Sequence, residues 1–385
     1  MRNTGLDLLR MFAVLLVIGR HLRLSESSSL VLKGLVRGGW TGVDIFFVLS
    51  GFLVSSLLFG EYRRQGSVNI RRFLIRRGFK IYPAFWLFLT FTLVMTQCLD
   101  QQPQTSQILG ELFFLQNYLG GMWNHTWSLA VEEHFYIGLA VLVTYLLAVN
   151  PRKPFRYVPA MFAVVAASCF ALRLVNLIFF PQYSHSTYLY GTHIRIDSLM
   201  FGVLLSYLWH FHDLENRTVR IPSCVLILIG LALLSPAFVF QLETNKMISI
   251  AGVILFYLAG GFLLIAAVRL KTSDSVAVRV VAELGAASYS IYLWHMPVAT
   301  WGYPLLSKLF GFESFCLYLF NAVIGACVFG WLLNRLIENP ILQVRDRLFP
   351  SHSSAVVTGE QIHPEPAAGL TSNEKKILRP GDPGC

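Results

Sequence analysis

The sequence predicts an all-α fold: a polytopic integral membrane bundle of about ten transmembrane helices with both termini in the cytoplasm. Hydrophobic residues make up 55% of the 385 residues and charged residues only 14%, and the mean hydropathy is +0.57. A soluble domain has about 25% charged residues. Apolar stretches of about 20 residues also recur along the chain, and their continuity argues against a membrane β-barrel, whose strands alternate. This composition excludes a disordered chain, a secreted disulfide scaffold and an ordinary soluble enzyme.

Ten apolar stretches are long enough to cross a hydrocarbon layer of about 30 Å as helices. The predicted spans are 6–24, 40–60, 80–98, 127–149, 157–180, 191–210, 221–240, 247–268, 284–305 and 314–335. The first is not expected to be a cleaved signal peptide, because it contains Asp7 and Arg10 and lacks a small-x-small cleavage site.

Basic residues predict how the bundle is oriented. The loop 61–80 carries seven Lys and Arg residues, whereas the loop 99–126 carries none. Basic loops at 150–156, 211–220 and 269–283 continue this alternation. The positive-inside rule therefore puts both termini in the cytoplasm. We expect a multi-pass protein of the cell's inner (plasma) membrane. The net charge of +10 is attributed to topology, and nucleic acid is not expected as a partner.

The chain is divided into a transmembrane domain at 1–348 and a polar, disordered cytoplasmic tail at 349–385, rich in Ser, Glu, Pro and Gly. The six cysteines lack the spacing of metal ligands and mostly fall in apolar stretches. Neither a metal site nor a disulfide framework is predicted.

Ionisable residues in the first span are the leading candidates for function, because charge is costly in a bilayer. Asp7 and Arg10 are three residues apart and can form an ion pair on one helix face. Arg10 and His21 are eleven residues apart, close to three turns, so they face the same side about 16 Å apart. This stripe predicts an anion-holding group near the cytoplasm and a base near the outside. The alternative is an interfacial histidine beside Arg20 and Arg23.

Other spans add ionisable residues in their outer halves. Asp44 lies at a depth similar to that of His21 and could orient its imidazole, or it could instead pair with a neighbouring arginine. Glu132 and Glu133 point about 100° apart on a helix, so one of them is expected to face a site, and Glu132 is favoured. Arg195, Asp197 and His295 complete this outer set. Each could alternatively stabilise helix packing.

The inner face carries a basic run before Tyr82. Arg71, Arg72, Arg76 and Arg77 match the geometry of phosphate, which coenzyme A carries in the cytoplasm. The alternative is that these residues set the topology and nothing more.

Seven motifs in chain order resemble those of the acyltransferase family 3 membrane proteins and cover about residues 3–345. They are LDxLRxxAxxxVxxxH at 6–21, GxDxFFxxSGF at 42–52, the basic run to Tyr82-Pro83, WSLxxExxFY at 127–136, RxDxLxxG at 195–202, SYxxYLxH at 288–295 and ExP at 338–340. Two positions depart from the family pattern. Leu8 stands where glycine is frequent, and Lys80 stands where arginine is usual.

The resemblance implies transfer of an acyl group, often acetyl in this family, from cytoplasmic acyl-CoA to a hydroxyl of a cell-surface glycan or a lipid-linked sugar in polysaccharide biosynthesis. His21 would be the general base, Asp44 would orient it, and Glu132 would assist on the acceptor side. The donor-binding set would be Arg10, Arg71, Arg72, Arg76, Arg77 and Tyr82. The acceptor-binding set would be Arg195, Asp197 and His295. No metal is implied.

Two other functions are consistent with buried charge. A transporter or permease would move a glycan precursor or another solute without acyl chemistry, and a non-catalytic scaffold would not need Arg and His on one stripe. Because no hydrolase-like domain is expected after the bundle, the membrane part or a separate partner would complete the transfer.

Overall fold

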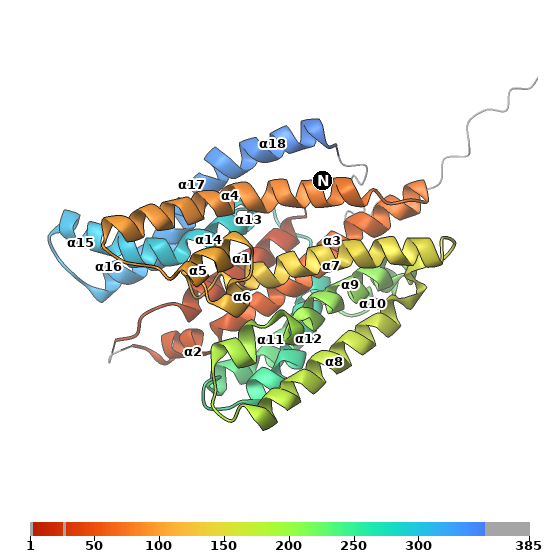
Figure 1. The fold of residues 1–385 in the computed structure, drawn as a ribbon, viewed down its shortest axis with the longest axis horizontal. Helices are drawn as coiled ribbons and strands as arrows, with labels where there is room; N and C mark the ends of the chain where they lie inside the picture. Colours follow the sequence, from red (N-terminus) through yellow and green to blue (C-terminus); the bar gives the residue numbers. More distant parts are fainter. Residues whose placement is uncertain (1–2, 26–27, 351–385) are drawn as a thin grey trace, which may run out of the picture.

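The computed structural model describes residues 3–25 and 28–350, and this part of the chain consists of helices and loops without a strand (Figure 1). The predicted tail lies outside the described residues apart from Phe349 and Pro350. The helices of the N-terminal half are α1 Thr4–Arg20, α2 Leu30–Gly38, α3 Gly42–Gln65, α4 Ile70–Cys98, α5 Thr105–Leu112, α6 Gln116–Leu119, α7 Trp127–Val149 and α8 Val158–Phe179. Those of the C-terminal half are α9 Ile196–Phe211, α10 Leu214–Thr218, α11 Ser223–Val239, α12 Val253–Arg269, α13 Val276–Ala286, α14 Ser288–Pro297, α15 Tyr303–Phe310, α16 Phe315–Phe320, α17 Ala326–Leu333 and α18 Asn339–Leu348.

The all-helical fold is confirmed, and all ten predicted spans are at least largely helical, but the count of about ten spans is not confirmed. Six helical segments in the described residues are long and apolar enough to cross a membrane. They are Leu30–Gln65, Ile70–Cys98, Trp127–Val149, Pro154–Phe179, Ile248–Arg269 and Phe315–Leu348. A seventh is possible if α13 and the helix Ser288–Phe310, bent by 71°, form one span.

Length explains the difference from the predicted count. Helices α1 and α11 have 17 residues and α9 has 16, so each is about 25 Å long. This is shorter than a hydrocarbon layer of about 30 Å. The orientation of the termini stays a prediction.

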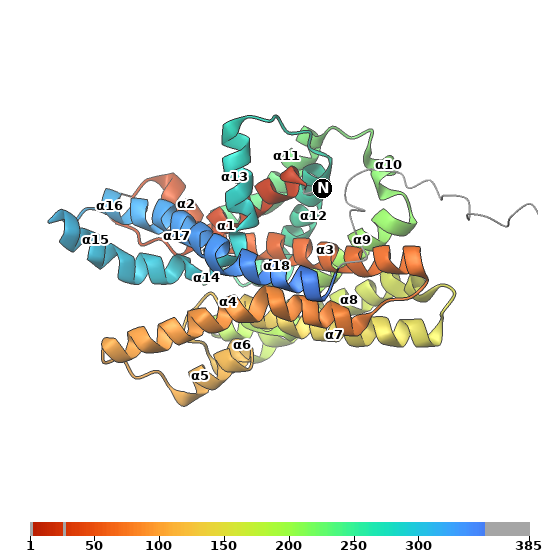
Figure 2. The ribbon, with the colours of Figure 1, turned by 90° about the horizontal axis from the view of Figure 1, so that it is seen from above.

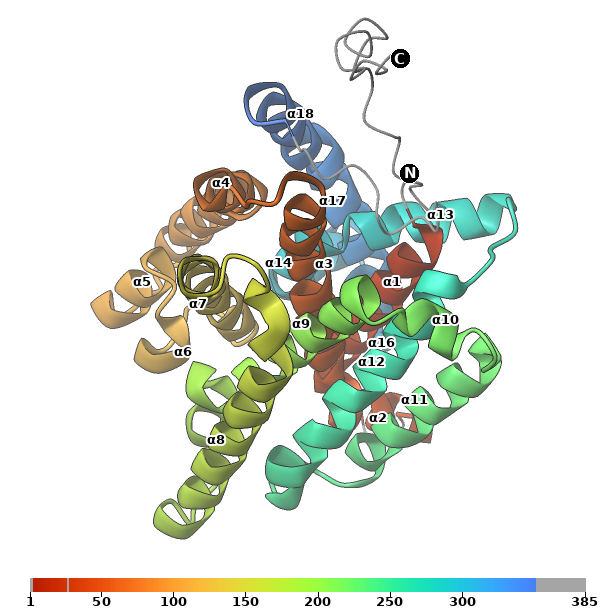
Figure 3. The same ribbon diagram turned by 90° about the vertical axis from the view of Figure 1, so that its right-hand side faces the viewer.

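Helix α3 occupies the centre of the bundle, and α8 and α4 lie at its periphery (Figure 3). In the segment Leu30–Gln65, 78% of the most apolar stretch is buried within the protein, against 11% in Pro154–Phe179. Glycine allows α3 and α9 to approach closely, because a Cβ at Gly51 would lie 2.0 Å from the carbonyl oxygen of Leu199. Gly51 therefore permits close contact between the two helices.

The long axis of the molecule separates two chemically different ends. Helix α4 runs along this axis, with its basic start toward the end that carries α10 and its last turns toward the end that carries α15 and α16 (Figures 1 and 2). The loop 99–126, which contains no Lys or Arg, follows the last turn of α4. We call its side the basic-poor face.

Candidate active site

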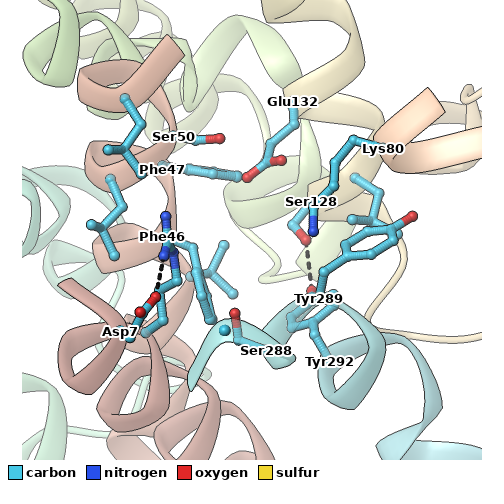
Figure 4. Close-up of a pocket in the computed structure, with 16 residues that line it drawn as sticks. Asp7, Phe46, Phe47, Ser50, Lys80, Ser128, Glu132, Ser288, Tyr289 and Tyr292 are labelled. Atoms are coloured by element: carbon cyan, nitrogen blue, oxygen red, sulfur yellow. Dashed lines mark hydrogen bonds and ion pairs between the residues drawn. The ribbon is translucent and has the colours of Figure 1, made fainter. Parts of the chain in front are cut away.

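A central cavity of about 340 Å³ lies between α1, α3, α4, α7 and α14 (Figure 4). Its wall is mostly apolar, but Ser50 and Glu132 project into it from one side and Ser288 and Tyr292 from another. Its lining residues are Asp7, Arg10, Val43, Phe46, Phe47, Leu49, Ser50, Leu53, Lys80, Ser128, Leu129, Glu132, Ala286, Ser288, Tyr289 and Tyr292. An elongated ligand that is mainly apolar, with a few polar groups and an anionic end, would suit such a wall.

The first cation of the cavity is Arg10, which Asp7 holds in place. The Arg10 guanidinium donates to the Asp7 carboxylate at 2.5 Å, as the spacing predicts. Asp7 is only 1% exposed, whereas 29% of the Arg10 side chain is exposed, so the cation faces the cavity from a buried anchor. Arg10 is therefore positioned to meet an anion.

The second cation is Lys80, which sits near the middle of α4. Its ammonium group forms an ion pair with Glu338, and Ser290 donates to the other oxygen of that carboxylate at 2.7 Å. Glu338 is buried in a π-helical turn, Asn334–Glu338, between α17 and α18. The motif ExP therefore supplies the counter-charge of a cavity lysine.

Glu132 and Glu133 take different directions, as predicted. Glu132 lines the cavity and accepts from the Tyr136 hydroxyl at 2.9 Å, and Ser50 is 2.6 Å from the same hydroxyl. Glu133 accepts from the Tyr82 hydroxyl at 2.9 Å, away from the cavity lining. The structure thus puts Glu132 in the same cavity as Arg10 and Lys80.

Three histidines from distant parts of the chain form what we call the histidine cluster. It consists of His21, His125 and His295. The ring centroids of His21 lie 5.1 Å from His295 and 6.3 Å from His125, and those of His125 and His295 are 4.8 Å apart. His125 and His295 are buried, and His21 is partly exposed.

Hydrogen bonds within this cluster define where the His21 proton sits. The Nδ1 atom of His21 is 2.9 Å from the carbonyl of Val17 and 3.3 Å from Nε2 of His295. A carbonyl only accepts, so Nδ1 carries the proton and Nε2 of His21 keeps its lone pair. Nε2 makes no hydrogen bond to any described residue. This tautomer is the one that a general base requires.

His125 is a site residue that sequence reasoning missed. Its Nε2 lies 3.1 Å from the carbonyl of Leu293, so the ring donates through Nε2 and Nδ1 is an unpaired, buried acceptor. Burial lowers the pKa of His125 to about 3, so the ring is neutral at pH 7. The available signal was a histidine two residues before Trp127, but the motif considered began at Trp127 itself.

Tyr292 connects the central cavity to the histidine cluster. Its ring lines the cavity and lies 5.5 Å from His125 and 5.8 Å from His295, measured between centroids. Its hydroxyl donates to the carbonyl of His125 at 2.6 Å. The histidine cluster therefore packs directly behind the part of the cavity wall that Tyr292 forms.

The basic run of α4 is largely engaged by other protein groups. Arg72 pairs with Glu61 at 2.6 Å, Arg76 pairs with Asp346 at 2.9 Å, and the Arg77 guanidinium lies 5.0 Å from the centre of the Tyr136 ring. Arg71 is exposed. Of the predicted donor-binding set, only Arg10 lines the central cavity, and Lys80 lines it as well.

Asp44 does not contact His21. Its carboxylate pairs with Arg195 at 2.7 Å, and both side chains are fully buried. Asp197 pairs with Arg173 of α8, which donates to its two oxygens at 2.6 and 2.7 Å. This ionic core joins α3, α8 and α9 outside the cavity lining, so the alternative of helix packing fits Asp44, Arg195 and Asp197 better than contact with His21 or substrate.

His295 was expected on the acceptor side, and the structure puts it directly against His21.

Among residues 3–25 and 28–350, no group of three or more His, Cys, Asp or Glu side chains is arranged to hold a metal ion.

Comparison with known proteins gives this arrangement its context. The sequence family described as an acyltransferase domain matches residues 3–335. The chain is 30% identical over 316 residues to O-acetyltransferase OatA of Staphylococcus aureus, and 32% identical over 326 residues to a putative O-acetyltransferase of the same species. Each alignment covers 76% of this chain, which spans about half the length of these relatives. No solved structure matches. With a family match over most of its helical bundle, the chain belongs to the acyltransferase family 3 membrane proteins and is an acyltransferase.

Proposed function

We propose that the protein is a membrane O-acetyltransferase that moves an acetyl group from acetyl-CoA to a hydroxyl of a cell-surface glycan or a lipid-linked sugar. The single observation that carries this proposal is the environment of His21. Its Nδ1 atom is hydrogen-bonded to Val17 and His295, and its Nε2 atom has no protein partner among the described residues. The histidine cluster that holds His21 adjoins the central cavity, which Arg10 and Lys80 line. The O-acetyltransferase names of the two relatives support the same group transfer.

The donor is assigned to the central cavity. A pantetheine arm is narrow and mostly apolar with two amides, which matches a wall of aliphatic and aromatic residues with scattered hydroxyls. Arg10 and Lys80 supply positive charge for the phosphate-bearing part of coenzyme A. The cytoplasmic source of the donor follows from the positive-inside prediction.

Acyl transfer then needs one proton acceptor. The acceptor hydroxyl gives its proton to Nε2 of His21 while its oxygen attacks the thioester carbonyl carbon. The C–O ester bond forms and the C–S bond breaks. The expelled thiolate takes the proton from His21 and leaves as coenzyme A. The roles of Glu132 and Tyr292 in this scheme are to line the donor cavity.

The test uses purified protein in proteoliposomes with radiolabelled acetyl-CoA and the glycan fraction of native membranes as acceptor. We expect His21→Ala to insert normally and to lose transfer by at least about 100-fold. His212→Ala is the matched control, because His212 is exposed and lies outside the cluster. Normal transfer by His21→Ala would eliminate the proposed base.

The competing transporter function is tested in the same vesicles. A transporter would accumulate solute without release of free thiol from acetyl-CoA, whereas the proposed enzyme releases one thiol for each ester formed. Solute uptake without thiol release would overturn the proposed function.

A further inference from the structure

A second cavity, of about 310 Å³, opens on the basic-poor face between the last turns of α4, the loop 99–126 and the π-helical turn Val298–Gly302. We call it the Trp–Gln pocket. Its polar and aromatic lining includes Thr92, Gln101, Gln102, Gln107, Trp123 and Trp301. None of the residues that line it is ionisable.

The side chains of this pocket select a ligand class. Threonine hydroxyls and glutamine amides both donate and accept hydrogen bonds, and indole rings offer large apolar faces. An anionic or cationic ligand would find no counter-charge here, and a purely apolar ligand would leave the amides unpaired. A neutral sugar ring fits, because it presents several hydroxyls at its edge and C–H groups on its faces.

One wall of the pocket is fixed before any ligand arrives. The indole nitrogen of Trp123 donates to the Thr92 hydroxyl at 3.1 Å. The Trp301 ring meets the Trp123 ring at 76° with centroids 5.1 Å apart, so the two indoles form a corner. The Gln107 amide donates to the carbonyl of Gly121 at 3.3 Å, which connects helix α5 to the loop that carries Trp123. Fixed aromatic groups lower the ordering cost of binding.

Two other amides are available to a ligand. Gln101 and Gln102 are exposed, and their side chains make no hydrogen bond to any part of the chain that the structure describes. They stand at the start of the loop that follows α4. A ligand in the pocket would therefore meet polar groups that no protein partner occupies.

The pocket is next to the histidine cluster. The rings of Trp123 and His125 are 6.3 Å apart between centroids, and His125 in turn packs against His21 and His295. Tyr292 borders the same histidines from the central cavity. The cluster therefore lies between two cavities of different chemistry, one with cations and one without charge.

We propose that the Trp–Gln pocket is the acceptor site and that it binds a neutral sugar unit, which presents a hydroxyl toward the histidine cluster. This inference rests on the proposed function and specifies its acceptor class. Neutral sugar units occur both in free glycan and in lipid-linked precursors, and the pocket recognises what the two share.

The experiment measures sugar binding directly, so it does not depend on catalysis. Full-length protein in nanodiscs is titrated with tetrasaccharides of glucose, mannose and N-acetylglucosamine, and with a uronic-acid tetrasaccharide of equal length. We expect at least one neutral tetrasaccharide to bind and the uronic-acid one to bind at least tenfold more weakly. The double variant Gln101→Ala/Gln102→Ala and the variant Trp301→Ala are expected to weaken neutral binding about tenfold. Gln97→Ala is the matched control, an exposed glutamine on α4 that does not line the pocket.

The outcomes separate this inference from the function on which it rests. Failure of all three neutral sugars to bind, equal binding of the uronic-acid sugar, or unchanged binding by both pocket variants overturns the acceptor site. Sugar binding that depends on Trp301 in a protein that never consumes acetyl-CoA would overturn the proposed function alone. Because Gln101 and Gln102 are exposed, their substitution is not expected to disturb folding. An unchanged melting temperature of the double variant checks this. Repeating the titration with N-acetylglucosamine on a polyprenyl diphosphate distinguishes the lipid-linked source from the free one.

Discussion

The Nε2 atom of His295 lies 3.3 Å from Nδ1 of His21, although the two residues are 274 positions apart. The Nδ1 atom of His295 is 2.5 Å from the carbonyl of Tyr292, so that nitrogen carries the proton of the His295 ring. His295 can therefore only accept at Nε2. This contact helps to keep the His21 proton on Nδ1 and its lone pair on Nε2.

We predict that His295→Leu lowers kcat about 10-fold to 100-fold and leaves KM for donor and acceptor nearly unchanged. The leucine preserves apolar packing but cannot accept from His21, so Nδ1 of His21 loses one of its two acceptors and the ring is held less firmly by the Val17 carbonyl alone. His295→Gln should recover part of kcat, because the glutamine side chain can bring an oxygen near the former Nε2. Steady-state kinetics of both variants, with His212→Ala as control, measure this difference. Equal loss in the two variants would mean that His295 only fills space.

Sequence reasoning predicted the local features of this site well. The helix Trp127–Val149 has the predicted bounds, and the Asp7–Arg10 ion pair follows from their spacing on one turn. Helical periodicity and i,i+3 pairing are local properties, so a single sequence contains them. The number of spans was harder to predict, because α1, α9 and α11 are shorter than the apolar stretches predicted at their positions.

The sequence alone does not show which residues far apart in the chain contact each other. Asp44 was assigned to His21 on the basis of similar depth, but depth does not determine which side of a helix faces which neighbour. Its actual partner, Arg195, is 151 residues away and was predicted as a substrate residue. His125 was missed because it precedes a span in a loop, where one histidine carries no periodic signal.

We predict that Asp44 and Arg195 stabilise the fold as a unit. Arg195→Met leaves a buried carboxylate without its cation and should destabilise the protein by about 3–5 kcal/mol. The double variant Asp44→Leu/Arg195→Met should recover much of this loss, because it removes both charges. Melting temperatures of Asp44→Leu, Arg195→Met and the double variant measure the coupling between the two residues. If the double variant folds but has no transferase activity, then Asp44 or Arg195 has a role in the reaction itself.

We predict that protein stability depends on pH through Glu111, which holds the loop before α7. Glu111 is fully buried and accepts from the Thr126 hydroxyl at 2.7 Å and the Met122 N–H at 3.0 Å. Burial raises the pKa of its carboxyl from 4.5 to about 7. The folded state therefore keeps a proton that the unfolded chain has lost between these two pH values, and stability falls as the pH rises.

The stabilising contribution of Glu111 is fully present below about pH 4.5 and is lost as the pH rises through about 7, an effect of about 3 kcal/mol. Glu111→Gln keeps the accepting oxygen and removes the titration, so its melting temperature should fall less between pH 5 and 8 than that of the unmodified protein. Glu313→Gln, an exposed position, is the control. Parallel pH profiles for the unmodified protein and Glu111→Gln would contradict this assignment.

We predict that Lys80 contributes to donor binding and that Glu338 holds it in place. Lys80 lines the central cavity, and its partner Glu338 is in turn fixed by Ser290. Lys80→Ala should raise KM for acetyl-CoA about tenfold, which corresponds to the loss of one partly screened charge interaction. Lys80→Arg should retain most of the affinity, because it keeps the charge.

Salt provides a readout that a purely structural ion pair would not give. The difference in KM between the unmodified protein and Lys80→Ala should shrink between 0.05 and about 0.5 M salt, because ions screen the attraction between Lys80 and the donor phosphates. Lys308→Ala, which removes an exposed lysine of α15, should change KM at neither salt concentration. A lower melting temperature for Lys80→Ala with an unchanged KM would assign the Lys80–Glu338 pair to folding alone, and it would leave Arg10 as the cation that meets the donor from this cavity.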